Sequence, residues 1–146
     1  SLVNAAITSP AYSYAATPQG FPQWFNYTPV WTAASTAPSL GNGTLQGRFT
    51  MQGKLVVASV YFLAGSTTTF GSGLWRFSMP LTNSGDHRGA GSLYNASNGT
   101  EYGGVSAVIG GGSIYLLYQT SIIQYNAPFT WASGSVLTAT ISYQSV

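Results

Sequence analysis

Hydrophobic and polar residues alternate along several segments of the chain. Within residues 43–51, leucine, glycine, phenylalanine and methionine alternate with threonine, glutamine and arginine. The same period of two occurs in residues 74–79 and 136–143. Successive side chains of an extended chain point to opposite faces, so each segment is predicted to be a strand with one face on a core and the other open to water or a neighbour.

One segment, residues 54–64, is apolar on both of its faces. Val56, Val60 and Phe62 share one face, whereas Leu55 and Tyr61 share the other. Such a strand either lies centrally with cover on each side or turns one face toward another subunit. We therefore expect Val56, Val60 and Phe62 to contact a second copy of the chain, in a homo-oligomer that we expect to be a trimer.

Turn signals are dense between these segments. Asn-Gly pairs at 42–43 and 98–99 are typical of hairpins, and three glycines at 110–112 separate two apolar runs. No segment carries the capping residues of a helix, and roughly eight strands can be distinguished. The pattern predicts an all-β fold, a jelly-roll or related antiparallel β-sandwich, as a single domain over residues 31–146 with an extended N-terminal arm before it.

The arm, residues 1–30, has no sustained period and carries four prolines among six aromatic residues. Proline removes a ladder donor, so we expect this stretch to be extended and largely unpaired. Its aromatic side chains either cover its own sandwich or lie on a neighbouring subunit, and both interpretations remain open. The candidate partner contacts in the second interpretation are Tyr12, Tyr14, Phe21, Trp24 and Phe25.

Composition limits the chemistry that is available. The chain has four basic and two acidic residues, a single histidine and no cysteine. Asp86 and Glu101 are the only side-chain carboxylates, whereas a glycosidase needs a suitably spaced pair, and too few ligands exist for a closed zinc site. We predict no catalytic residue, no metal and no cofactor, and we expect the protein not to be an enzyme.

The same scarcity of charge bears on partners. Four scattered basic residues cannot neutralise a run of phosphates, so we expect no nucleic acid. The longest nearly apolar run, 55–64, is far shorter than the roughly 20 residues of a spanning helix, so we expect no membrane. Trp24, Trp31 and Trp131 are candidates for stacking on sugar rings, with burial in the core as the alternative for each.

Part of the chain resembles a known block of sequence. The stretches GNGTLQGRF (41–49), Gly53-Lys54 and GSTTTFGSGLWRFSMP (65–80) resemble a block found in virion proteins of phages that infect actinobacteria. In those proteins the block belongs to tail-associated and other surface-exposed β-rich domains. The resemblance covers about a third of the chain. It implies a β-rich protein on the virion surface, and it carries no catalytic residue.

Two structural roles on a virion follow as hypotheses. The first is a capsid decoration (cement) protein that clamps neighbouring major capsid subunits; a start at Ser1, the residue left when an initiator methionine is removed, and the lack of a fibre-like repeat favour it. The alternative is a receptor-binding head of a tail fibre or minor tail protein, joined to a fibre shaft and recognising host cell-wall carbohydrate. In both, the protein is made in the host cytoplasm and is non-enzymatic.

Overall fold

The computed structural model describes residues 23–85 and 87–146, which form ten β-strands and no helix. The strands are β1 (Phe25–Tyr27), β2 (Trp31–Ala33), β3 (Thr44–Gln52), β4 (Leu55–Leu63), β5 (Trp75–Ser78), β6 (Arg88–Asn95), β7 (Thr100–Gly110), β8 (Ser113–Tyr118), β9 (Ser121–Ile122) and β10 (Val136–Gln144). Every paired strand is antiparallel. The predicted all-β antiparallel class is therefore confirmed. Among the described residues, no helix has the length and apolar character needed to cross a membrane.

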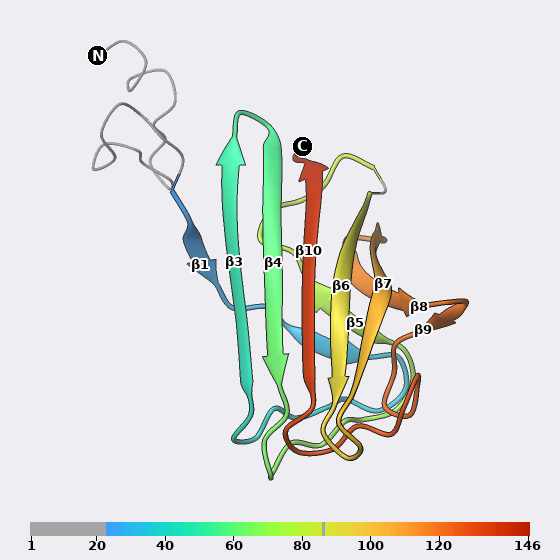
Figure 1. Ribbon diagram of the computed structural model, residues 1–146. Helices are drawn as coiled ribbons and strands as arrows, with labels where there is room; N and C mark the ends of the chain where they lie inside the picture. Colours follow the sequence, from blue (N-terminus) through green and yellow to red (C-terminus); the bar gives the residue numbers. More distant parts are fainter. Residues whose placement is uncertain (1–22, 86) are drawn as a thin grey trace.

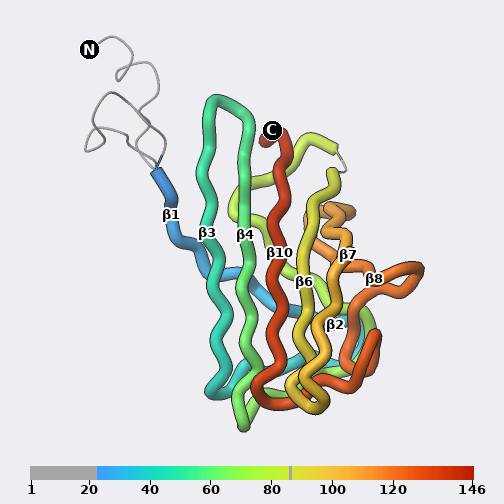
Figure 2. Tube along the Cα trace, viewed as in Figure 1, coloured from blue at the N-terminus to red at the C-terminus, as the bar shows by residue number. Residues whose placement is uncertain are grey.

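The strands form one curled sheet. Their order is β1-β3-β4-β10-β6-β7-β8-β5-β2, with β9 paired to β8. Only residues 28–30 separate β1 from β2, although these strands lie at opposite ends of that order. The sheet must curl so that its two ends meet. Figures 1 and 2 show the result: β1, β3, β4, β10 and β6 run side by side in one layer, and β2, β5 and β8 run across behind them.

The predicted alternation is confirmed in β3, β5 and β10. In β3, Phe49 is buried whereas Gln46 and Arg48 are exposed, and in β10 the buried Ile141 and Tyr143 alternate with exposed residues. The period of two gives each strand one face that packs between the layers and one that faces outward. The inward faces of both layers build a single core.

The core is dominated by aromatic rings that join the two layers. Trp31 of β2 lies against Phe62 of β4 with ring centroids 4.8 Å apart, and Trp75 of β5 lies 5.9 Å from the same ring. Trp131 completes the cluster at 4.8 Å from Trp75 and 6.0 Å from Phe62. Rings 4.5–7 Å apart in tilted or edge-on arrangements attract each other beyond their area burial. These contacts fix the two layers as a sandwich.

The structure corrects the expected role of the inward residues of β4. Val56, Val60 and Phe62 are 0%, 3% and 0% exposed, so they lie inside the core of their own chain and cannot contact a partner while the fold is intact. The outward face of β4 is the open one, with Leu55 at 50% and Tyr61 at 38% exposure. The sequence showed two apolar faces, but only the curl of the sheet decides which of them is covered.

Part of the expected N-terminal arm belongs to the sheet. Phe25–Tyr27 forms β1 and pairs with β3, with Phe25 opposite Phe49. The ring of Phe25 packs 5.5 Å from that of Phe49. The ring of Tyr27 packs against the core, and its hydroxyl donates to Ser78 O at 3.4 Å. Tyr12, Tyr14 and Phe21 lie outside the described residues, and their contacts stay a prediction.

Two of the three hairpin turns that were predicted from the sequence are found in the structure. Asn98-Gly99 lies in the turn from β6 to β7, and Gly111-Gly112 joins β7 to β8 with φ of 57° and 78°. The pair Asn42-Gly43 forms a turn that leads into β3, but it does not join two paired strands, because β2 pairs with β5. The hairpin of β3 and β4 turns at Gly53, at a φ of 60° that favours glycine.

Candidate functional site

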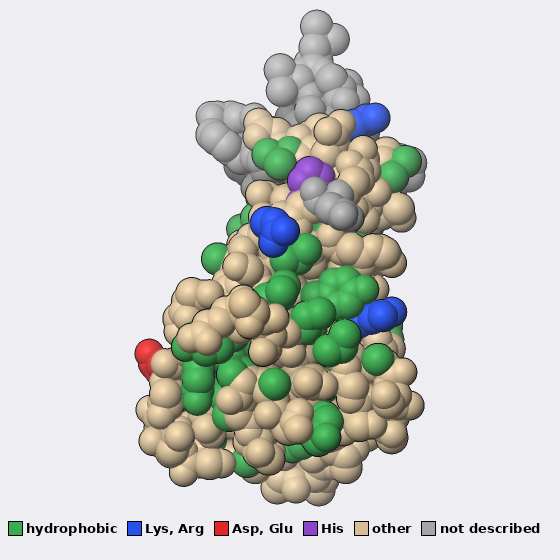
Figure 3. Space-filling view, turned by 90° about the vertical axis from the view of Figure 1, so that its right-hand side faces the viewer, with side chains coloured by type: hydrophobic (Ala, Val, Ile, Leu, Met, Phe, Trp, Pro, Cys, Tyr) green, Lys and Arg blue, Asp and Glu red, His purple; other side chains and the backbone are tan. Residues whose placement is uncertain are grey.

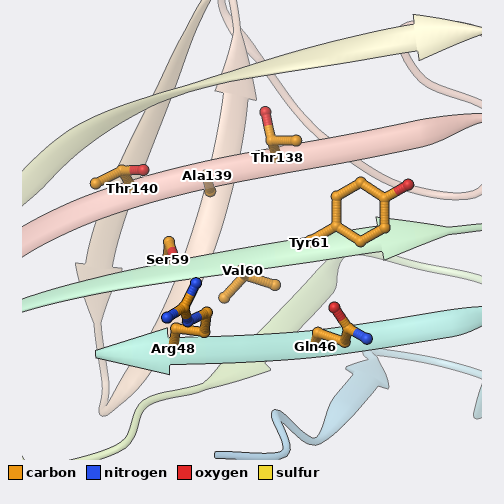
Figure 4. Close-up of a pocket in the computed structure, with 8 residues that line it drawn as sticks. All are labelled: Gln46, Arg48, Ser59, Val60, Tyr61, Thr138, Ala139 and Thr140. Atoms are coloured by element: carbon orange, nitrogen blue, oxygen red, sulfur yellow. The ribbon is translucent and has the colours of Figure 1, made fainter. Parts of the chain in front are cut away.

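A shallow groove of about 210 Å³ lies on the outer face of the sheet, over the middle of β3, β4 and β10. We call it the outer groove. Figure 4 shows its side chains, most of which are polar. The lining residues are Gln46, Arg48, Ser59, Val60, Tyr61, Thr138, Ala139 and Thr140.

The register of the three strands explains why these side chains meet. Gln46 is paired with Tyr61, and Tyr61 with Thr138, which makes one row across the sheet. Two residues further along each strand, a second row is formed by Arg48, Ser59 and Thr140. Residues directly opposite on neighbouring strands have Cβ atoms about 4.5–5.5 Å apart, so each row is a continuous line of side chains.

A small residue in the middle of the second row creates the hollow. Ser59 is short and lies between Arg48 and Thr140 on the neighbouring strands, while the larger Tyr61 rises beside it. A phenol ring next to short hydroxyls offers both an apolar surface and polar groups. The groove can therefore hold a polar molecule that has a flat apolar face.

Most polar side chains of the outer groove are not engaged with other protein groups. Thr138 Oγ1 lies 2.8 Å from Ser92 Oγ in a hydrogen bond. Within the described parts of the chain, no side-chain hydrogen bond is made by Gln46, Ser59, Tyr61 or Thr140. Their donors and acceptors are directed at solvent and are available to a ligand.

A second cluster of polar side chains differs from the outer groove, because its groups are hydrogen-bonded to one another. At the loop end of the sandwich, Asn42 Nδ2 donates to Ser66 Oγ at 2.9 Å and Asn42 Oδ1 accepts from Thr67 N at 2.9 Å. Thr68 Oγ1 donates to Leu40 O at 2.6 Å. These groups bind each other and hold two loops together. That cluster is therefore structural, in contrast to the outer groove.

Arg48 gives the outer groove its charge. Its guanidinium lies over the ring of Trp24 at 5.7 Å from the ring centroid, and Trp24 is 48% exposed. Contacts of this kind at exposed sites contribute about 0.5–1 kcal/mol, which is enough to bias the side chain toward this position. Arg48 lines the groove, and Trp24, which lies outside the lining, supports its guanidinium.

No described carboxylate side chain neutralises Arg48. Glu101, on β7, is four strand positions away in the sheet order, or about 19 Å along the sheet at ~4.8 Å per strand. That separation exceeds the Debye length of about 8 Å at physiological salt. Figure 3 shows the same scarcity on another side of the molecule, where charged atoms are few and far apart.

Two further hollows adjoin the outer groove. One, of about 520 Å³, lies between β1 and β3 and shares Gln46 and Arg48 with it. The other, of about 290 Å³, lies over β10, β6 and β7 and contains Ser92, the hydrogen-bond partner of Thr138, together with Tyr94. The three hollows follow one another across the strands from β1 to β7.

The three tryptophans that are candidates for stacking on sugar rings differ in their exposure to solvent. Trp31 and Trp131 are 8% and 3% exposed and belong to the core, so only Trp24 presents a ring to solvent. Of the other expected contacts, Phe25 is half-buried on Phe49. Sequence reasoning missed the outer groove, although the outward positions of the alternating segments contained four of its eight lining residues.

Titratable groups form no cluster in the described residues. No group of three or more His, Asp and Glu side chains there could hold a metal ion. Glu101 lines the hollow over β7, and Asp86 lies outside the described residues. Burial raises the pKa of Tyr27 far above its ordinary value, and the nearby Tyr143 adds to the rise, so Tyr27 stays neutral.

Comparison with known proteins gives a partial relative. The chain is 28% identical over 110 residues to the Mu-like prophage FluMu defective tail fiber protein of Haemophilus influenzae. The match covers 72% of this chain but only 18% of that protein. No family model matches the chain, and no solved structure matches it. Most of this chain is thus similar to a part of a prophage tail fibre protein.

Proposed function

We propose that this chain is a receptor-binding domain of a phage tail fibre or minor tail protein, which attaches the virion to carbohydrate on the host cell surface. The observation that carries the proposal is the outer groove, where unengaged hydroxyl and amide groups surround the ring of Tyr61. Sugars present hydroxyl groups around flat apolar faces, and such a surface complements both. Similarity to part of a tail fibre protein supports the tail location over capsid decoration.

The proposal describes binding without turnover. The groove is lined by one arginine, one tyrosine and several hydroxyl and amide side chains, and its lining includes no carboxylate and no imidazole. In this role, several copies of the domain would bind the cell surface at the same time. We therefore keep self-association, as a trimer carried on a fibre shaft, within the proposal, since multivalent attachment strengthens weak single contacts.

Three finer points belong to the same proposal. A domain of this kind lies on the virion surface, where it reaches the host. The sequence resemblance suggests phages of actinobacteria, whereas the partial relative comes from a prophage of Haemophilus influenzae. Binding of the chain to a panel of bacteria tests the host. Sedimentation of the full chain at micromolar concentration tests the oligomeric state, and a 15.3 kDa monomer would contradict the trimer.

The test is binding of the fluorescently labelled chain to whole bacterial cells before and after periodate oxidation of their glycans. Tyr61→Ala is expected to weaken binding roughly tenfold, the effect of about 1.4 kcal/mol. Tyr125→Ala is the matched control, because Tyr125 has the same exposure (39% against 38%) but lies outside the groove. Binding that survives periodate, or that both variants reduce equally, would contradict the proposal.

A further inference from the structure

The three hollows make one path across the outer face. Gln46 and Arg48 line both the outer groove and the hollow beside β1. The hollow over β7 is its neighbour on the other side, because Ser92 of that hollow is hydrogen-bonded to Thr138 of the outer groove. From β1 to β7 the path crosses five strand spacings, about 24 Å along the sheet at ~4.8 Å each. A path of this length matches a chain of several sugar rings better than a single one.

The charged and aromatic side chains occupy different parts of the path. Asn26 and Arg48 lie at the β1 end, Tyr61 and Thr138 in the middle, and Tyr94 with Glu101 at the β7 end. Exposed tyrosine rings therefore occur twice along it, with hydroxyl groups between them. The positive charge is at one end and the negative charge at the other.

Arg48 is placed to recognise an anion. Within the described residues the Arg48 guanidinium contacts the Trp24 ring and makes no hydrogen bond or ion pair, so its N–H groups remain free to donate. The planar fork of these groups matches the oxygens of a carboxylate or a phosphate in a bidentate contact. Because no described carboxylate side chain is near, that edge is left for a ligand.

We propose that this path binds an extended acidic glycan, with a carboxylate or phosphate group of the glycan on Arg48. The inference rests on the proposed function and adds the chemical class of its target. A single cation on the path, with Glu101 at its far end, suits a sparsely charged glycan and disfavours a polymer with a charge at every unit. Tyr61 and Tyr94 supply the surfaces for ring contacts.

The experiment measures affinities of the full chain for three polymers with one backbone: a neutral dextran, a dextran that carries sparse carboxymethyl groups, and a dextran that carries sparse phosphate groups. Arg48→Gln is compared with Arg76→Gln, a matched control, because Arg76 also lies over an aromatic ring, at 5.3 Å from the centroid of Tyr115, but in the other layer. Both variants are first checked for an unchanged unfolding midpoint. Arg48→Lys retains the charge and loses the fork.

We expect at least one acidic polymer to bind more tightly than dextran. Arg48→Gln should weaken that binding about 10- to 100-fold, as for a hydrogen bond to a charged group, while Arg76→Gln leaves it unchanged and Arg48→Lys falls between them. Whichever acidic polymer binds identifies the source of the anion. Raising the salt concentration should weaken binding of the original chain more than binding of Arg48→Gln.

Other outcomes overturn the inference. Equal affinity for dextran and the acidic polymers, with no effect of Arg48→Gln, would remove the acidic preference and leave the proposed function intact. Equal losses in Arg48→Gln and Arg76→Gln would show a non-specific attraction to a basic protein. If none of the polymers binds, the inference fails, and the periodate experiment on cells still decides the proposed function separately.

Discussion

Two neighbouring residues of β4 should differ strongly in how much stability is lost when each is replaced by alanine. Phe62→Ala removes a ring that is 0% exposed and that lies 4.8 Å, 5.9 Å and 6.0 Å from the rings of three tryptophans. The tryptophan rings around the space are packed against one another, so they can relax into it only in part. We expect a loss of about 3–5 kcal/mol, which is typical of a buried Phe→Ala change.

Tyr61→Ala should leave the fold almost unchanged. Tyr61 is 38% exposed on the outward face, so its removal opens no cavity, and the expected loss is under about 1 kcal/mol, mostly from strand preference. The same variant is the one expected to weaken glycan binding. Of these two adjacent residues, Phe62 is therefore expected to affect stability and Tyr61 to affect glycan binding.

Urea unfolding followed by tryptophan fluorescence measures both effects. With a slope near 2 kcal/mol per molar urea, Phe62→Ala should lower the midpoint by about 1.5–2.5 M and Tyr61→Ala by less than about 0.5 M. If Phe62→Ala is unfolded before urea is added, Phe62→Leu gives the smaller shift of the same sign. Equal shifts for positions 61 and 62, or a shift below about 0.5 M for Phe62→Ala, would refute the assignment of the two faces.

Three further changes test other parts of the fold. Tyr143→Phe removes the hydroxyl that donates to Leu81 O at 2.8 Å and accepts from Leu81 N at 3.2 Å, and it should cost about 1–3 kcal/mol in the same unfolding assay. Gly47→Ala should cost about 1–3 kcal/mol, because the added Cβ would lie 2.3 Å from a ring carbon of Tyr27, whereas Gly103→Ala meets nothing within 4 Å and should be nearly neutral. Burial raises the pKa of Tyr27 in the folded state, so its contribution to stability is complete below the ordinary pKa near 10 and is lost as the pH rises above it. The drop in urea midpoint between pH 8 and pH 11 should accordingly be smaller in Tyr27→Phe, and an equal drop would contradict the assigned burial.

Local patterns predicted the elements well where one side of a strand is buried. The alternating segments around Phe49, Trp75 and Ile141 became β3, β5 and β10 with the expected faces inward. Alternation carries this information because a side chain's face follows directly from its position in an extended chain. Short strands were less visible, since β1, β2 and β9 have only two or three residues, too few for a period.

The candidate site could be predicted only in part. The outward positions of β3 and β10, Arg48 and Thr140 among them, are readable from the sequence as polar. Their meeting on either side of Ser59 depends on β10 pairing with β4, although residues 64–135 lie between these strands. No local pattern specifies which distant strands become neighbours.

The sequence by itself determined an all-β chain with alternating faces, dense turns and too few charged groups for most chemistry. The tertiary structure alone decided that Val56, Val60 and Phe62 face the core, that Trp31 and Trp131 are unavailable to a ligand, and which polar residues share a groove. The physical reason is that a strand with two apolar faces can be buried on either one. Only the curl that brings β1 and β2 together covers one face of β4 and leaves Tyr61 open.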